Sequence, residues 1–427
     1  MKRILFIVFS ILNVLTLSSC GSSSEKPSTT TTQPYNKVTI ENINDFEIDY
    51  NEDNTATITK YVGEPVEVIV PNTVIKDGIE YSVKTIGRDA FRNNRKITYV
   101  FISEGITHIE LGAFYGCEYL VRISIPNSAE YIGDSAFMMC WGLRQDYIEY
   151  DNGYYLGNSN NPFIILMDVK DTPFESLEIN PEAKFIYYQS ISGASNLKSL
   201  YIPENIIQIG TNIVGGCFKL TSIVVDKNNQ VYDSRDNCNA IIETEPNRLI
   251  CTCKTSTIPN TVKRLGVYSL NSDFETINIP YGVQVIEANA CVGEDNITSL
   301  VIPDSVSIIE AGAFEICHSL KTVILPANLR TIERHTFLGC SSLESIVIPY
   351  TVTTIKESAF ERCSRLLKVY YGGKTQGHIN ISFEGRSTGE IENATWYYLT
   401  TNGATETESG YWWYYDADGT IKEVVNN

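Results

Sequence analysis

Residues 320–366 read LKTVILPANLRTIERHTFLGCSSLESIVIPYTVTTIKESAFERCSRL. The same residue types return 23 positions later, so that Pro326 is followed by Pro349, Phe337 by Phe360 and Cys340 by Cys363. A period of this length indicates a solenoid, because each unit is too small to bury its apolar residues except against its neighbours.

Each unit begins with a pattern such as Leu-x-x-Ile-x-Ile-Pro. Alternating apolar residues predict a short strand with one buried face, and the proline ends it because proline removes a backbone donor. An apolar pair and the motif Ala-Phe-x-x-Cys-x-x-Leu then lead back to the next strand. Stacked at ~4.8 Å per turn, these units predict a parallel sheet on one face and an inner column of phenylalanines at positions 91, 114, 137, 314, 337 and 360.

Two units are longer than the others. The leading apolar position moves by 31 residues from Leu143 to Phe174 and again from Leu220 to Cys251. Each insert contains two short apolar runs separated by turn residues, which predicts a β-hairpin. We expect both hairpins to protrude from the same edge of the solenoid. The runs are residues 153–155 and 162–165 in the first insert, and 231–232 and 240–242 in the second.

The full repeat, Ile-Pro followed by Ile-Gly and Ala-Phe-x-x-Cys-x-x-Leu, resembles the BspA-like (Treponema-type) leucine-rich repeats of bacterial surface proteins. The resemblance covers roughly residues 45–371. It implies a right-handed leucine-rich repeat solenoid with a parallel β-sheet on one face, irregular or short helical returns and β-rich caps. It also implies a cell-surface role in adhesion or recognition, and it brings no shared catalytic residues.

The first residues are typical of an exported, lipid-anchored chain. Lys2 and Arg3 precede an apolar run that ends in Leu-Ser-Ser-Cys-Gly, which resembles the lipobox of bacterial lipoproteins with Cys20 as the acylated residue. We therefore predict a signal peptide over residues 1–19 and a flexible Ser/Thr/Pro tether over 20–36. The predicted location is the bacterial cell envelope, exposed on the outer membrane, although the sequence leaves the leaflet open.

The remaining domain boundaries follow from where the period starts and stops. Residues 37–85 are predicted to form an N-terminal β cap, residues 86–371 the solenoid with its two hairpin-bearing long repeats, and residues 372–427 an aromatic C-terminal β cap. We expect most of Trp396, Trp412 and Trp413 to lie in the core of that last cap, with a sugar-stacking platform as the alternative.

The charge balance argues against polyanionic partners. The chain has 33 basic and 51 acidic residues, a formal net charge of −18. Such an excess of acid disfavours nucleic acid and anionic lipid surfaces, so membrane contact is expected through the lipid anchor only. A soluble, monomeric surface domain is the prediction.

The sequence favours a binding protein over an enzyme. It contains no metalloprotease, serine hydrolase, P-loop or dinucleotide motif, so no catalytic residue, cofactor or metal is predicted. Six cysteines share one repeat slot that accepts alanine at position 194, which indicates a reduced, inward-packing ladder. The only cysteines that form a cluster outside this pattern, Cys238, Cys251 and Cys253, lack the spacing and fourth ligand of a zinc site.

The candidate binding residues are outward strand positions between the buried aliphatics. A run of exposed apolar side chains would mark a partner site, although residues with high β propensity also occur there without any such role. Three functions stay open: binding of a protein or cell-surface ligand on host matrix or other bacteria, binding of glycan for a nutrient-uptake system, or a structural envelope role. The candidate residues are Phe101, Tyr201, Val301, Ile324, Val347 and Tyr370.

Overall fold

The computed structural model describes residues 43–270, 274, 276–373, 381–385, 388–400 and 410–426. The predicted signal peptide, Cys20 and the tether lie outside these residues. Within the described part, no helix is long and apolar enough to cross a membrane.

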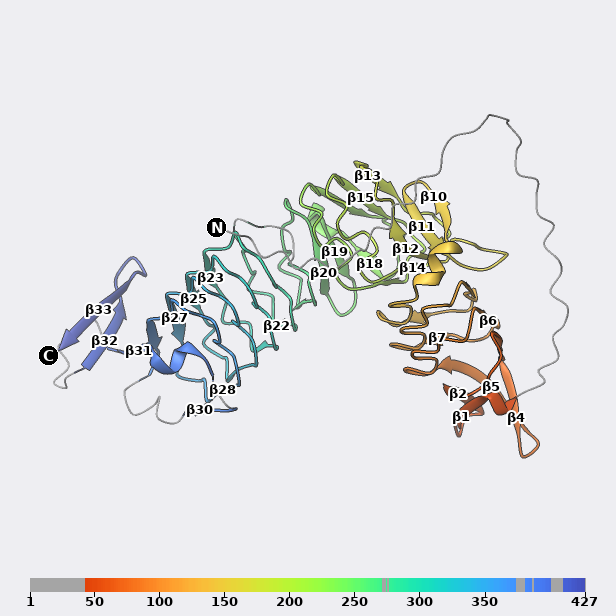
Figure 1. Ribbon diagram of the computed structural model, residues 1–427. Helices are drawn as coiled ribbons and strands as arrows, with labels where there is room; N and C mark the ends of the chain where they lie inside the picture. The colour runs from red at the N-terminus through yellow and green to blue at the C-terminus, as the bar shows by residue number, and fades with distance from the viewer. Residues whose placement is uncertain are drawn as a thin grey trace, which may run out of the picture. The chain divides into compact units, whose positions relative to one another are not determined.

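The chain forms a β-solenoid of about 14 turns with parallel strands and almost no helix. Figure 1 shows these strands stacked as successive turns, most clearly from β22 to β28. The predicted fold class is therefore confirmed. Regular helix in the described residues is limited to four 3-10 segments: η1 (Ile43–Asp45), η2 (Trp141–Gln145), η3 (Arg235–Asn237) and η4 (Glu390–Asn393).

The first side of each turn is the strand that ends in proline. These strands pair in parallel, residue by residue, with the equivalent residue of the next turn, as Val100 does with Ile123. The long repeats divide this first ladder into three sheets. They are β3 (Glu67–Val70), β6 (Tyr99–Ile102) and β8 (Arg122–Ser124); β13 (Ser176–Glu178), β15 (Ser199–Ile202) and β17 (Ser222–Val225); and β23 (Ser299–Val301), β25 (Thr322–Ile324), β27 (Ser345–Ile348), β29 (Lys368–Tyr371), β31 (Thr395–Leu399), β32 (Gly410–Tyr415) and β33 (Ile421–Asn426).

The second side carries a ladder of very short strands at the Ile-Gly positions. At Gly133 in this ladder the turns approach closely, because a Cβ there would lie 2.5 Å from the backbone nitrogen of Leu111. The strands of this second ladder are β1 (Phe46–Tyr50), β2 (Thr55–Tyr61), β4 (Thr73–Lys76), β5 (Ile79–Ile86), β7 (His108–Ile109) and β9 (Tyr131–Ile132); β10 (Ile148–Tyr150), β11 (Gly153–Leu156), β12 (Ile165–Val169), β14 (Phe185–Ile186) and β16 (Gln208–Ile209); β18 (Tyr232–Asp233), β19 (Ala240–Glu243), β20 (Arg248–Thr252), β21 (Arg264–Leu265), β22 (Val285–Ile286) and β24 (Ile308–Ile309); and β26 (Thr331–Ile332), β28 (Thr354–Ile355) and β30 (Ser382–Phe383).

The third side is a series of turns around the Phe and Cys slots. Consecutive turns are joined by backbone hydrogen bonds, such as Phe114 N–H to Ala136 O at 2.8 Å. The phenylalanine rings stack inside, with the centroids of Phe337 and Phe360 5.4 Å apart. This inner column confirms the packing predicted from the repeat.

The two inserts form the predicted hairpins, but they do not protrude. β11 pairs antiparallel with β12, and β19 with β20. β12 and β20 then continue as parallel members of the second ladder by pairing with β14 and β21. The prediction of protruding hairpins is wrong because both faces of these strands are apolar and buried: Tyr155, Leu166, Ile241 and Ile242 are all fully inaccessible.

The parallel ladder continues past Tyr371, where the sequence period stops. β31 pairs in parallel with β29, and β32 pairs in parallel with β31 before turning into the antiparallel strand β33. Trp412 and Trp413 are buried and Trp396 is half-buried against the core. The prediction that most of these tryptophans lie in a C-terminal core is confirmed.

The stacked ring of Phe337 provides a test of this packing. Phe337 is fully buried, whereas Phe218 is 61% exposed. We predict that Phe337→Ala lowers the free energy of unfolding by about 3–5 kcal/mol, because it removes a buried ring and leaves a cavity. The matched variant Phe218→Ala should change it by less than about 0.5 kcal/mol. Chemical denaturation followed by circular dichroism measures both, and equal losses would contradict the inward column.

Candidate functional site

The outward face of the first ladder is exposed on β15 and β17. Strand alternation directs Leu200 and Ile223 inward and places Tyr201 and Val224 outside. Tyr201 and Val224 are paired in register, and they are 42% and 47% exposed. The Tyr201 hydroxyl donates to the carboxylate of Asp226, which orients the ring on the sheet surface.

The same face is partly exposed on β23 and β25. Val301 pairs with Ile324. Val301 is 61% exposed, whereas Ile324 is half-buried and packs against the C-terminal aromatic residues. Phe101 lies half-buried in β6, in a different sheet. The predicted residues therefore do not form one continuous strip.

The C-terminal hairpin covers the last two predicted positions. Val347 and Tyr370 are buried, together with Tyr397 and Trp413, in a cluster of their own. The ring centroids of Tyr370 and Trp413 are 5.7 Å apart, and the Tyr370 hydroxyl donates to Glu423 on β33. The prediction that Val347 and Tyr370 are exposed is wrong, because a segment outside the repeat folds back over them.

A second exposed apolar group lies on the third side, in the turns after β7 and β9. Tyr119 and Trp141 are 57% and 59% exposed, and Met138 and Met139 are about 40% exposed. The N–H of Gly142, the residue after Trp141, donates to the carbonyl of Glu118, the residue before Tyr119, at 3.2 Å. We call Tyr119, Met138, Met139 and Trp141 the aromatic–methionine group.

Sequence reasoning missed this group, although a signal for it exists. The repeat slots of Met139 and Trp141 are occupied by Gly339 and Ser341 two hundred residues further on. Most other turns also carry small or polar residues at these slots, with Ile316 and Phe218 as exceptions, so large apolar residues there indicate a surface with an added role. The guanidinium of Arg144 also lies 6.0 Å from the Trp141 ring centroid, so the group combines aromatic, methionine and arginine side chains.

The repeat-slot cysteines are part of the core. All ten described cysteines are buried, and each slot thiol donates to the carbonyl 26 residues earlier. Burial raises the pKa of the Cys363 thiol to about 12. No metal-binding group of histidine, cysteine or carboxylate residues occurs among the described residues. The thiol–carbonyl distances run from 3.0 to 3.3 Å for Cys117, Cys140, Cys217, Cys317, Cys340 and Cys363.

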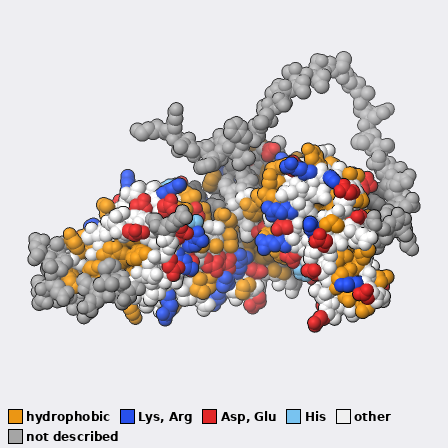
Figure 2. Space-filling view, turned by 60° about the horizontal axis from the view of Figure 1, so that its bottom comes forward, with side chains coloured by type: hydrophobic (Ala, Val, Ile, Leu, Met, Phe, Trp, Pro, Cys, Tyr) orange, Lys and Arg blue, Asp and Glu red, His pale blue; other side chains and the backbone are white. Residues whose placement is uncertain are grey.

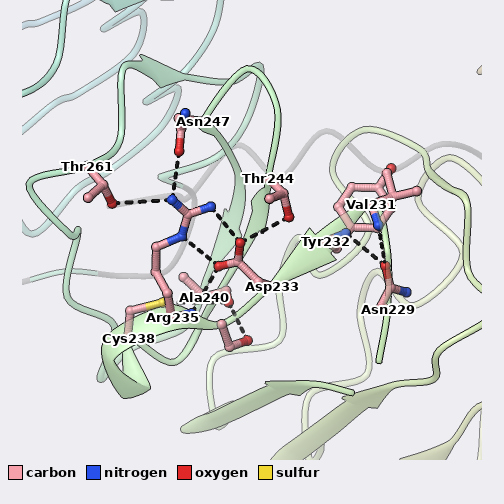
Figure 3. Close-up of polar contacts among 11 residues, drawn as sticks. Asn229, Val231, Tyr232, Asp233, Arg235, Cys238, Ala240, Thr244, Asn247 and Thr261 are labelled. Atoms are coloured by element: carbon pink, nitrogen blue, oxygen red, sulfur yellow. Dashed lines mark hydrogen bonds and ion pairs between the residues drawn. The ribbon is translucent and has the colours of Figure 1, made fainter. Parts of the chain in front are cut away.

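Polar residues of the second long repeat form a network that stabilises the hairpin. Figure 3 shows Arg235 between Asp233 and Asn247; its Nη1 lies 2.6 Å from Asn247 Oδ1. Thr244 Oγ1 donates to the same carboxylate at 3.0 Å. Burial alone would raise the pKa of Asp233, but these hydrogen bonds outweigh it and hold the pKa below its usual range. The carboxylate is thus fully engaged within the hairpin.

A buried carboxylate links that hairpin to the following turns. Glu287 accepts from Arg248 Nη2 at 2.8 Å and from Arg264 Nε at 2.9 Å. Burial alone would raise the pKa of Glu287, but the hydrogen bonds from Arg248 and Arg264 outweigh it and hold the pKa below its usual range. The geometry is that of an internal ion pair, with both carboxylate oxygens occupied by this chain.

The face of the molecule shown in Figure 2 has no large area of a single charge. Acidic and basic side chains are interspersed with hydrophobic ones on the face shown in Figure 2. Many of the basic residues pair with a carboxylate on a neighbouring turn, as Arg95 does with Glu118 and Lys198 with Glu175. Whether nucleic acid is a partner is not tested by this arrangement, and its exclusion stays a prediction from the net charge.

Comparison with protein families identifies the repeat. A family model described as BspA type leucine rich repeat region matches in six copies over residues 74–158, 169–241 and 249–367. A search of curated proteins finds no match.

Solved bacterial structures are similar over most of their length. A leucine rich cell surface protein from Faecalibacterium prausnitzii is 27% identical, with 79% of this chain and 96% of that chain covered and a TM-score of 0.39. A leucine-rich repeat protein from Eubacterium ventriosum is 18% identical, with coverages of 86% and 96% and a TM-score of 0.48. The pneumococcal vaccine antigen PcpA is 17% identical, with coverages of 81% and 95% and a TM-score of 0.39.

The Glu287 ion pair gives a pH-dependent prediction. The depressed pKa of Glu287 means that its stabilisation is present above the pKa of an unfolded glutamate, about 4.3, and is lost as the pH falls through the lower folded value. Glu287→Gln should lower the free energy of unfolding by about 2–3 kcal/mol at neutral pH, and by less as the pH drops below about 4.

The exposed pair of Arg334 and Glu357 provides the control for this variant. Glu357→Gln should cost less than about 0.5 kcal/mol at any pH, because water screens an exposed pair. Urea titrations at several pH values measure both variants. A loss for Glu287→Gln that does not depend on pH would contradict the ion-pair assignment.

Proposed function

The chain belongs to the BspA type leucine rich repeat family, and from this premise we propose that it is a lipid-anchored bacterial surface protein that binds a protein partner on host matrix or on other cells. Leucine-rich repeat solenoids generally serve as binding scaffolds without catalysis. A stack of short strands presents a long, rigid surface, which suits recognition of a macromolecule.

The aromatic–methionine group is the observation that carries the proposal. Protein interfaces are enriched in aromatic residues, methionine and arginine, and tryptophan and tyrosine dominate their binding energy. Trp141 and Tyr119 combine this chemistry with exposure of more than half of each residue. Their turns are held by the backbone ladder, so little ordering is needed on binding.

The outward face of the first ladder supplies a second contact surface in this proposal. Tyr201 and Val301 remain candidates on the basis of their exposure. Ile324 and Phe101 are half-buried and would contribute less. Val347 and Tyr370 are withdrawn from the contact surface because the C-terminal hairpin covers them.

A soluble chain of residues 22–427 allows the partner proposal to be tested. We predict saturable binding to immobilised extracellular-matrix proteins or to whole bacterial cells. The double variant Tyr119→Ala/Trp141→Ala should weaken this binding at least tenfold, because each side chain has the character of a hot spot worth about 2 kcal/mol. Surface plasmon resonance and cell-binding assays provide the measurement.

Tyr281, which is 74% exposed and lies outside both surfaces, provides the control. Tyr281→Ala should bind as the wild type does. Normal binding by the double variant would exclude the aromatic–methionine group, and the variant Tyr201→Ala/Val301→Glu would then test the ladder face. Absence of binding to every protein and cell target would contradict the proposed function and favour a structural envelope role.

The anchor is tested separately. We predict that the full chain partitions into the detergent phase and that mass spectrometry finds acyl chains on its first mature residue, Cys20. Cys20→Ser should release the protein into the aqueous phase, because one residue carries the whole anchor. Membrane association of Cys20→Ser equal to that of the wild type would contradict lipid anchoring.

A further inference from the structure

The second ladder is divided into four sheets, and two of its three interruptions lie at the long repeats. The third lies between β24 and β26, where two turns of ordinary length follow one another. In the neighbouring turns, an N–H donates to a carbonyl 23 residues earlier, as Ser307 does to Gln284 at 3.0 Å and Thr353 to Arg330 at 2.9 Å. β24 and β26 are successive turns, yet they belong to different sheets.

The interruption leaves backbone groups of both strands without partners. Within the described residues, the N–H groups of Arg330 and Glu333 have no hydrogen-bond acceptor, and the carbonyls of Ser307 and Ile309 accept no hydrogen bond. These four groups are the ones that would pair if the ladder were closed. One strand therefore offers acceptors and the other offers donors along the same gap.

A cleft of about 440 Å³ lies over this gap. Its floor is apolar, since Ile309 and Leu329 are buried in the core. The side chains of Ile308, Glu310, Arg330 and Glu333 line it. Its volume falls in the range of small-ligand sites, about 300–1,000 Å³.

The rest of the stack limits how wide the gap becomes. On the first side, Val301 and Ile324 stay paired across the same two turns. On the third side, the Gly312 N–H still donates to Arg334 O at 3.0 Å. A guest peptide strand would need a further ~4.8 Å between the lips, which would break these bonds. A group that spans the lips with a single atom does not require this widening.

We propose that this cleft binds one neutral hexose unit of a glycan. A hydroxyl is both donor and acceptor, so one sugar hydroxyl accepts from the backbone N–H of Arg330 or Glu333, the residues that flank β26, and donates to a carbonyl on the β24 side. Neighbouring hydroxyls on a pyranose ring repeat this bridge along the gap. Ile308, which is half exposed, supplies an apolar contact for the C–H face of the ring.

The charged residues of the rim favour a neutral sugar. Glu333 is paired with Lys356 at 2.9 Å, and Glu310 accepts from the Ala288 N–H at 3.0 Å. With Arg330, the rim carries two acidic and two basic groups, so it attracts neither anions nor cations strongly. The carboxylate oxygens retain lone pairs that accept hydrogen bonds from sugar hydroxyls.

This site is separate from the proposed protein-binding surface. None of the cleft residues belongs to the aromatic–methionine group or to the exposed ladder positions Tyr201 and Val301. Loss of glycan binding and loss of protein binding are therefore independent outcomes.

Saturation-transfer difference NMR on residues 22–427 tests the proposal with the methyl pyranosides of glucose, galactose and mannose. We expect at least one to bind. Ile308→Trp should abolish its signal by occupying the cleft, and Glu310→Gln should weaken binding at least threefold. Thr354→Trp, at the same register position on the paired strand β28, should bind as the wild type does.

Two outcomes of that experiment would overturn the proposal: no signal from any of the three glycosides, or unchanged binding by both Ile308→Trp and Glu310→Gln with normal circular dichroism. Hydrogen exchange gives a second, ligand-free test. The Arg330 and Glu333 amides should exchange at least about tenfold faster than those of Thr353 and Lys356, because only the latter pair is hydrogen-bonded. Equal protection would mean that the ladder is closed and would also overturn the proposal.

Discussion

Each turn of this protein buries its apolar residues only against the turns before and after it, and the rest of the structure depends on that constraint. The constraint requires equivalent residues to lie above one another, so Phe337 stacks on Phe360 and the thiol of Cys363 donates to the carbonyl of Phe337. It also explains why the long repeats place their hairpins within the stack, since an apolar hairpin outside it would have nothing to cover it.

The same constraint decides which surfaces are free to bind. A turn at the end of a stack exposes its core, and β31 to β33 extend and fold over the last turns here. That cover removes Val347 and Tyr370 from the surface, leaving the outward face open on β15, β17 and β23. Where two turns separate on one side only, as β24 and β26 do, the other two sides keep the core intact, and the gap becomes a polar cleft with an apolar floor.

The repeat could be predicted from the sequence because its period is local and recurs many times. Strand positions and the inward Phe and Cys slots follow from which residues recur after 23 positions. The two hairpins follow from the inserts that lengthen two of the units. Exposure of Val347 could not be predicted, because it depends on Trp413, which is far along the chain and outside the period. The gap between β24 and β26 is also invisible in the sequence, since Arg330 and Glu333 carry no mark of an unpaired N–H. The aromatic–methionine group can be detected in the sequence by comparing the residues that occupy the same slot in different repeats.

A double-mutant cycle tests most directly the claim that stability comes from neighbouring turns. The changes in the free energy of unfolding should be measured for Phe337→Ala, Phe360→Ala and Phe114→Ala, and for the pairs of Phe337 with each of the others. We expect a coupling of about 0.5–3 kcal/mol between Phe337 and Phe360, which are in contact, and less than about 0.5 kcal/mol between Phe337 and Phe114. Equal coupling in the two pairs would contradict it, because distant turns would then share one cooperative core.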